Sequence, residues 1–197
     1  MRGNSMKILH NITVEEMISV FLIAELNSPR WGKKIENILL KNKIDKRIVT
    51  SPNISNSREN SLRALVLGEF RGYGKKDGLF DDIDEVISWK KVLLESEDFK
   101  KIKYIDYDYW NELSGKTGFV VDGAKNVKKG MEIFNVSNKQ YWQILEHVKN
   151  GGKFPSLILL SDKTGGLKLL EGHVRLTGYL LDNKNIGPLE VIVGFKS

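Results

Sequence analysis

The fold of the C-terminal half is decided by the stretch FPSLILLSDKTGGLKLLEGHVRLTGYLL, Phe154 to Leu181. SLILL is an apolar run of strand length, KTGG predicts a tight turn, and LKLLE predicts the returning strand. From His173 onward, the apolar residues recur at helical spacing. Gly172 falls between the strand and the helix, where a sharp bend favours a residue that tolerates a positive φ. The stretch therefore predicts a hairpin that turns directly into a helix.

The bend at Gly172 brings together groups that can bind an anion. The first N–H groups of a helix have no intrahelical partner and lie at the positive end of its dipole, so they favour phosphate. Arg175 could offer a fork of donors to phosphate oxygens, and His173 could supply a hydrogen bond or a proton. Glu171 could serve there as a Mg²⁺ ligand, a general base or a partner of Arg175. These residues predict a phosphate-handling loop.

Together with the last predicted strand, PLEVIVGF, this stretch resembles the core of the ParB/sulfiredoxin-like superfamily. The resemblance is close from Phe154 onward and looser from Tyr104. The family includes chromosome-partitioning proteins that bind CTP, the ATP-using reductase sulfiredoxin and a free serine kinase. By resemblance, Gly172, His173 and Arg175 match the loop that holds nucleotide phosphates.

The resemblance implies a nucleotide-binding protein, and an ATP- or CTP-dependent NTPase or phosphotransferase is one form of it. A nucleoside triphosphate and Mg²⁺ are the implied ligands. Sulfiredoxin's essential cysteine would fall at His173, and the chain contains no cysteine, which excludes that reductase chemistry. The lack of cysteine also excludes disulfides and thiolate metal sites. A relative without catalytic activity, which uses the loop for partner contacts, is a further alternative.

Residues 1–99 predict a mainly helical region. Thr13 and Glu16 form a capping box ahead of one amphipathic helix, and Asn56 with Glu59 can cap a later one. The stretch DIDEVISWKKVLL is compatible with a short helix or an extended segment. Residues 100–197 are richer in strand patterns. The prediction is an α+β fold with a helical N-terminal half packed on a small mixed-sheet domain, divided between residues 99 and 100.

A second unusual segment is YIDYDYWNELSG, which begins at Tyr104. If the segment stays extended, Asp106 and Asp108 share one face and could hold Mg²⁺ against a triphosphate with Glu171. The predicted metal ligands are Glu171 and Asp108, and the predicted catalytic residues are Glu171, His173, Asp106 and Asp108. Tyr107 and Trp110 could stack on a base. The alternative is an edge strand with its acids in water and its aromatic residues buried between domains.

Arg30 and Arg71 fall in turns that follow predicted helices, where a guanidinium can reach a ligand. Both are therefore candidate nucleotide-binding residues. The alternative is that they pair with acids such as Glu69 or Glu59 and stabilise the helical half.

The net charge of +6 comes from 31 basic and 25 acidic residues, and the densest basic run is Arg30 to Arg47, with seven basic and two acidic residues. A nucleic-acid backbone could bind such a run, which gives a second hypothesis: a nucleic-acid-binding or regulatory module. The ordinary alternative is a solvated helix face with extended lysines. The apolar runs are too short to cross a membrane and no cleavable signal pattern is present, so the predicted location is cytoplasmic.

Overall fold

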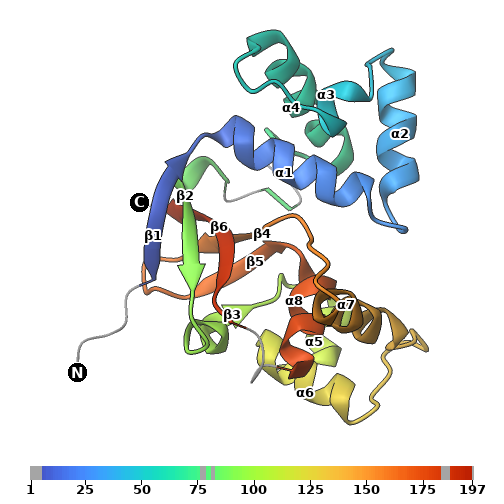
Figure 1. Cartoon of the computed structure of the whole chain (residues 1–197), viewed down its shortest axis with the longest axis vertical. Coiled ribbons are helices and arrows are strands. Elements are labelled where there is room, and N and C mark those ends of the chain that lie inside the picture. Colours follow the sequence, from blue (N-terminus) through green and yellow to red (C-terminus); the bar gives the residue numbers. More distant parts are fainter. Residues whose placement is uncertain (1–5, 76–78, 81–82, 183–186, 197) are drawn as a thin grey trace. The chain divides into compact units, whose positions relative to one another are not determined.

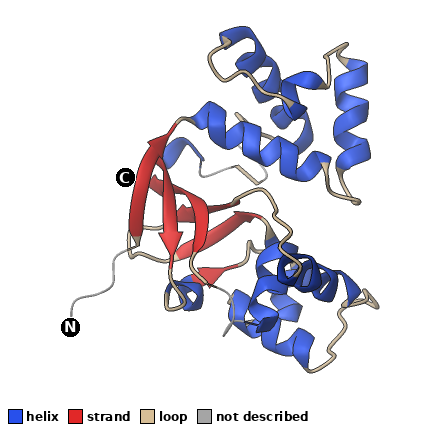
Figure 2. Ribbon diagram, in the orientation of Figure 1, coloured by secondary structure: helices blue, strands red, loops and turns tan. Residues whose placement is uncertain are grey.

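The computed structural model describes residues 6–75, 79–80, 83–182 and 187–196. It is an α+β protein with N-terminal helices and a mixed six-stranded sheet with interleaved helices (Figures 1 and 2). The chain divides into two compact units, one made of Ile12–Trp89 and the other of Met1–Asn11 together with Lys90–Ser197. The boundary predicted at residues 99/100 differs from this division, because residues 90–99 and the first strand belong to the second of these units.

The described part of the unit Ile12–Trp89 contains four α-helices, which Figure 1 labels. They are α1 (Val14–Leu26), α2 (Gly32–Lys41), α3 (Arg47–Thr50) and α4 (Ser57–Arg71). The capping box predicted for α1 is confirmed: the Glu16 N–H donates to Thr13 Oγ1 at 3.2 Å, and the Thr13 N–H donates to Glu16 Oε2 at 2.6 Å. The Asn56 cap of α4 is also confirmed, because its side chain accepts from the Glu59 N–H.

Arg63 fixes the connection between α3 and α4. Its side chain is fully buried. Nη1 donates to the carbonyl of Ile48 at 2.9 Å, and Nη2 donates to the carbonyl of Asn53 at 3.1 Å and to the side chain of Asn60. One guanidinium thus satisfies backbone carbonyls that a short helix and its following loop leave without partners.

The sheet has the strand order β1-β2-β6-β4-β5-β3. Its strands are β1 (Lys7–Ile12), β2 (Val86–Leu94), β3 (Ile102–Lys103), β4 (Leu157–Ser161), β5 (Leu167–Glu171) and β6 (Leu189–Lys196). β4 pairs antiparallel with β5 and parallel with β6, with Leu159 opposite Leu169 and Val193. β5 also pairs parallel with β3, through Ile102 with Leu167 and Lys103 with Lys168, so the beginning of β5 has a strand on each side, whereas Glu171 at its end pairs with Ile158 of β4.

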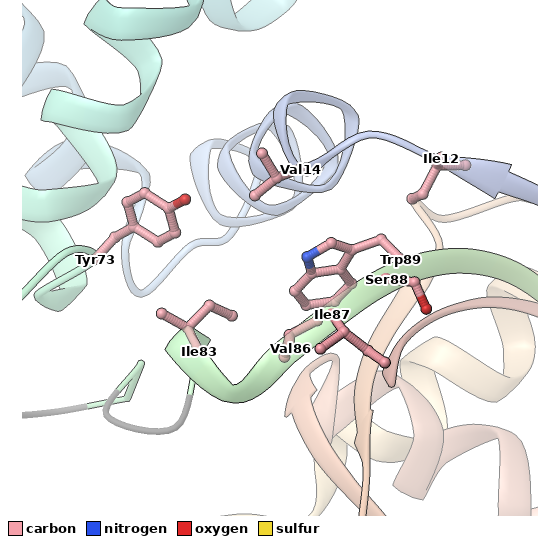
Figure 3. Close-up of a pocket in the computed structure, with 8 residues that line it drawn as sticks. All are labelled: Ile12, Val14, Tyr73, Ile83, Val86, Ile87, Ser88 and Trp89. Atoms are coloured by element: carbon pink, nitrogen blue, oxygen red, sulfur yellow. The ribbon is translucent and has the colours of Figure 1, made fainter. Parts of the chain in front are cut away.

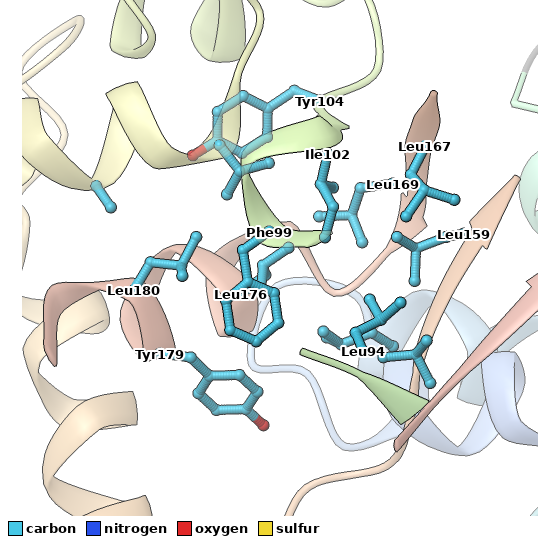
Figure 4. Close-up of a cluster of buried hydrophobic side chains, with 14 of the residues drawn as sticks. Leu94, Phe99, Ile102, Tyr104, Leu159, Leu167, Leu169, Leu176, Tyr179 and Leu180 are labelled. Carbon is cyan, nitrogen blue, oxygen red and sulfur yellow. The ribbon is translucent and has the colours of Figure 1, made fainter. Parts of the chain in front are cut away.

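Four further α-helices belong to the sheet-containing unit: α5 (Asp108–Leu113), α6 (Val120–Lys128), α7 (Lys139–Lys149) and α8 (His173–Tyr179). Short 3₁₀ turns cover Ile83–Glu85, Asp98–Lys101 and Leu180–Asp182. α8 packs closely on α7, because a Cβ on Gly178 would lie only 2.7 Å from Cβ of Ile144. The buried side chains of β3, β4, β5 and α8 form one hydrophobic core with Leu94 and Phe99 (Figure 4).

The structure decides between the two alternatives that the sequence left open for the segment before residue 95. The stretch DIDEVISWKKVLL is mainly the strand β2, preceded by a single 3₁₀ turn. The helix α7 begins after Asn138, whose side chain does not cap it, and Ser137 Oγ accepts from the Lys139 N–H at 3.2 Å. Asn138 instead donates its side-chain amide to the carbonyl of Met131 at 2.8 Å. Among the described residues, no helix combines the length and apolar character needed to span a membrane.

Candidate functional site

The candidate site is the junction of β5 and α8. β5 ends at Glu171, Gly172 adopts φ +101° and ψ 22°, and α8 begins at His173. The left-handed backbone predicted for Gly172 is confirmed. A Cβ at this position would overlap Leu157 Cδ2 and would lie 3.4 Å from Nη2 of Arg175. The bend therefore requires glycine for both its backbone conformation and its close packing.

Arg175 points into the protein. Its side chain is 10 % exposed, and so is that of Glu171 at the end of β5, with which Nη2 forms an ion pair. Nη1 donates to the backbone carbonyl of Pro155, in the segment that leads into β4. A guanidinium has five N–H donors, so within the part of the chain that the structure describes these two bonds leave three of them without a protein partner. Glu171 and Pro155 thus hold the head group of Arg175 beside the bend at Gly172.

His173 takes part in a stack of three aromatic rings. The Trp110 ring centroid lies 5.1 Å from that of His173 and 4.8 Å from that of Tyr104. The interplanar angles are 19° and 17°, so the rings are nearly parallel. Trp110 comes from α5 and Tyr104 from the segment after β3, so the stack joins three separate segments at the start of α8. Trp110 is itself buried.

A chain of two hydrogen bonds connects the same stack to the backbone of α8. The Thr177 hydroxyl donates to the carbonyl of His173 at 2.7 Å, and the Tyr104 hydroxyl lies 2.7 Å from Thr177 Oγ1. A threonine hydroxyl has only one proton, so Tyr104 is the donor of the second bond. Burial raises the pKa of Tyr104, which keeps that proton in place. Gly123 of α6 leaves space for the Tyr104 hydroxyl, because a Cβ at this position would overlap it.

Tyr179, at the end of α8, is sensitive to the charges of the Glu171–Arg175 pair. Burial raises the pKa of Tyr179, the positive charge of Arg175 opposes this shift, and the negative charge of Glu171 adds to it. The Tyr179 ring also lies 6.4 Å from that of Phe154. The site therefore has an aromatic wall beside the ion pair.

Two of the predicted acidic residues, Asp106 and Asp108, are exposed, unlike the buried Glu171. Asp106 and Asp108 do not share a strand face, because β3 ends at Lys103 and Asp108 begins α5. Both carboxylates are exposed, and Asp106 accepts a hydrogen bond from the Asn111 side chain at 2.8 Å. An acid in the first turn of a helix interacts favourably with the helix dipole, which accounts for Asp108. Tyr107 is 51 % exposed and outside the ring stack.

Glu171 fits the role of partner to Arg175 better than the role of a Mg²⁺ ligand. Its carboxylate is buried against a guanidinium, and a second cation at the same oxygens would be repelled by that positive charge. Among the residues that the structure describes, no three His, Asp or Glu side chains gather in one place.

Arg30 and Arg71 belong to the unit Ile12–Trp89 and gather around Trp31. Their guanidinium carbons lie 4.6 and 4.3 Å from the centroid of that ring. Arg71 also forms an ion pair of 2.9 Å with Glu25. The structural alternative for Arg71 is therefore confirmed with a different partner, since Glu69 binds Lys41 instead.

A pocket of about 450 Å³ lies elsewhere, within the unit Ile12–Trp89 (Figure 3). Its lining comes from the end of β1, the start of α1, the segment after α4, the 3₁₀ turn and β2. The lining residues are Ile12, Val14, Tyr73, Ile83, Val86, Ile87, Ser88 and Trp89. It contains no predicted site residue and no charged side chain, so it does not fit a phosphate.

The sequence does not predict the contributions of Tyr104, Thr177 and Pro155. Thr177 follows His173 by four residues, which is the spacing of a side chain that donates to the preceding turn of its own helix. Pro155 contributes only a backbone carbonyl, and no side-chain pattern marks such a role. Comparison with models of protein families, with curated proteins and with solved structures finds no match.

Proposed function

We propose that the β5–α8 junction binds the phosphate groups of a nucleotide, and that this protein is a nucleotide-binding protein of the ParB/sulfiredoxin-like type. One observation carries the proposal: the guanidinium of Arg175 lies beside the left-handed bend at Gly172, where α8 begins. A guanidinium beside the first amides of a helix attracts phosphate oxygens by charge and by directed hydrogen bonds. The order β4, turn, β5, bend, α8, β6 supports the resemblance.

In this proposal Glu171 controls the availability of Arg175. Without ligand, the carboxylate neutralises the guanidinium and keeps it from being a buried, unpaired charge. A phosphate approaching the amides of α8 would compete with Glu171 for Arg175 or use the remaining guanidinium donors. His173 follows the bend directly, and its stacking on Trp110 fixes its ring. The proposal contains no metal-dependent step, because the donor set does not fit Mg²⁺.

Titration calorimetry with ATP, CTP and GTP tests the proposal, because replacing Glu171 and replacing Arg175 should change the nucleotide affinity in opposite directions. Glu171→Gln keeps a hydrogen-bond acceptor but removes the competing charge, so it should tighten nucleotide binding by roughly tenfold. Arg175→Gln should abolish binding. Arg58→Gln, an exposed arginine of α4 with the same loss of charge, should leave binding unchanged.

Two outcomes would contradict the proposal. One is the absence of binding by any nucleoside triphosphate at millimolar concentration. The other is an affinity that neither Glu171→Gln nor Arg175→Gln changes. Because Arg175→Gln leaves a buried carboxylate without its cation, its folding must be checked by circular dichroism. The double variant Glu171→Gln/Arg175→Gln removes both charges together and should also fail to bind.

A further inference from the structure

The surface of α2 carries a concentration of positive charge that the proposed nucleotide site does not use. Two of the seven basic residues between Arg30 and Arg47 pair with carboxylates, Lys41 with Glu69 at 3.2 Å and Lys46 with Glu36 at 2.6 Å. The other five are exposed, and none has a carboxylate within ion-pair distance among the residues that the structure describes. Lys33 and Lys34 belong to α2, whereas the others precede it or follow it up to the first residue of α3, and together we call these five the α2 basic surface: Arg30, Lys33, Lys34, Lys43 and Arg47.

Aromatic rings, rather than acids, position one end of this surface. Arg30 lies over Trp31, and the Lys34 ammonium lies 5.5 Å from the Phe70 ring and 5.7 Å from that of Trp31. Trp31 and Phe70 meet edge to face, with centroids 6.0 Å apart. A ring face holds a cation in place without neutralising its charge. The N–H donors of Arg30 and Lys34 therefore remain available to an anion while their positions are restricted.

We propose that the α2 basic surface binds the phosphate backbone of a nucleic acid without reading its bases. A ten-residue helix is about 15 Å long, which spans about four phosphates of one strand at 3.4 Å each. The basic residues at the two ends of α2 can therefore contact several phosphates of one nucleic-acid strand, which a single phosphate group does not offer.

The apolar side of α2 explains why nucleic acid fits this surface better than a membrane does. Ile35, Ile38 and Leu39 are buried in the unit's own core. Leu40, which is 79 % exposed, is the one large hydrophobic side chain that α2 presents to solvent. A helix that binds in a bilayer interface needs a whole apolar face to insert.

Fluorescence anisotropy with labelled single-stranded and duplex oligonucleotides over about 50–200 mM salt tests the proposal. Five phosphate contacts predict a slope of log affinity against log salt of about −4.5 for a duplex and about −3.5 for a single strand. The variant Arg30→Gln/Lys33→Gln/Lys34→Gln should reduce the duplex slope by about 2.7. The matched control Lys128→Gln/Lys129→Gln/Lys139→Gln removes three exposed charges at the end of α6 and the start of α7 and should leave the slope unchanged.

A second pair of variants tests whether the ring positions the charges. Trp31→Leu keeps every cation but removes the ring, so it should weaken binding, and Trp31→Phe should restore most of the affinity. Equal losses in the two triple variants, an affinity independent of salt, or equal binding to phosphatidylserine vesicles would overturn the proposal. Arg175→Gln should not change oligonucleotide binding. This variant therefore distinguishes a failure of the nucleic-acid proposal from a failure of the proposed nucleotide site.

Discussion

Replacing Gly172 by alanine tests the geometry on which the candidate site depends. At φ +101°, an L-residue is strained, at a cost of about 1–2 kcal/mol. The added Cβ would also overlap Leu157 Cδ2 in the packed interior, and overpacking of this kind costs about 1–3 kcal/mol. Gly172→Ala is therefore expected to lower the free energy of unfolding by about 2–5 kcal/mol. Urea denaturation followed by circular dichroism measures this difference.

The turn between β4 and β5 provides a matched control for this experiment. Gly165 also has a positive φ, +84°, but a Cβ there would meet no atom within 4 Å. Gly165→Ala should therefore show the backbone cost alone, about 1–2 kcal/mol. Leu157→Ala removes the overlapping methyl group, so Gly172→Ala should cost less in that background. The reasoning is refuted if Gly172→Ala destabilises no more than Gly165→Ala, or if its cost is the same with and without Leu157.

Three further predictions concern other buried groups. Tyr104→Phe removes the donor to Thr177 and should lower the free energy of unfolding by about 1 kcal/mol in urea denaturation; an unchanged stability would contradict the hydrogen bond. Arg63→Met leaves buried carbonyls without donors and should cost about 3 kcal/mol, whereas Arg58→Met, at an exposed position, should cost little. Burial raises the pKa of Tyr104 and of Tyr141. Above about pH 10 the unfolded chain loses these protons while the folded protein retains them. The free energy of unfolding should therefore be unchanged below that pH and fall above it by about 1.4 kcal/mol per pH unit for each tyrosine. The decline should be smaller in Tyr104→Phe, which has one such tyrosine fewer.

The features predicted correctly from the sequence are local ones. A capping box is formed by residues three apart, and Thr13 with Glu16 needs no tertiary contact to form it. The hairpin of β4 and β5 likewise has its turn residues between its two apolar runs. The bend at Gly172 was predictable for the same reason, because the strand pattern ends just before this residue and the helical spacing begins just after it.

The features that the sequence did not predict depend on distant partners. β1 has no periodic apolar face, since five of its six residues are exposed and the sixth is half-buried, and it is a strand because β2 lies beside it in the sheet. The pairing of β3 with β5 joins Ile102 to Leu167, and no local pattern specifies it. Asp106 and Asp108 looked like a strand pair because aromatic residues alternate with them. The chain instead turns into α5, where Trp110 can reach His173.

The unit that contains the Gly172 junction is built from two separated pieces of chain, with the helical unit inserted between them. A ribosome releases a protein from its N-terminus, so Ile12–Trp89 emerges whole while most of the sheet is still unmade. The helical unit can complete its own folding at that stage. The strand β1, by contrast, must wait for β2, which follows the helices in the chain, and β6 takes its place between β2 and β4 only after both of those strands have been made.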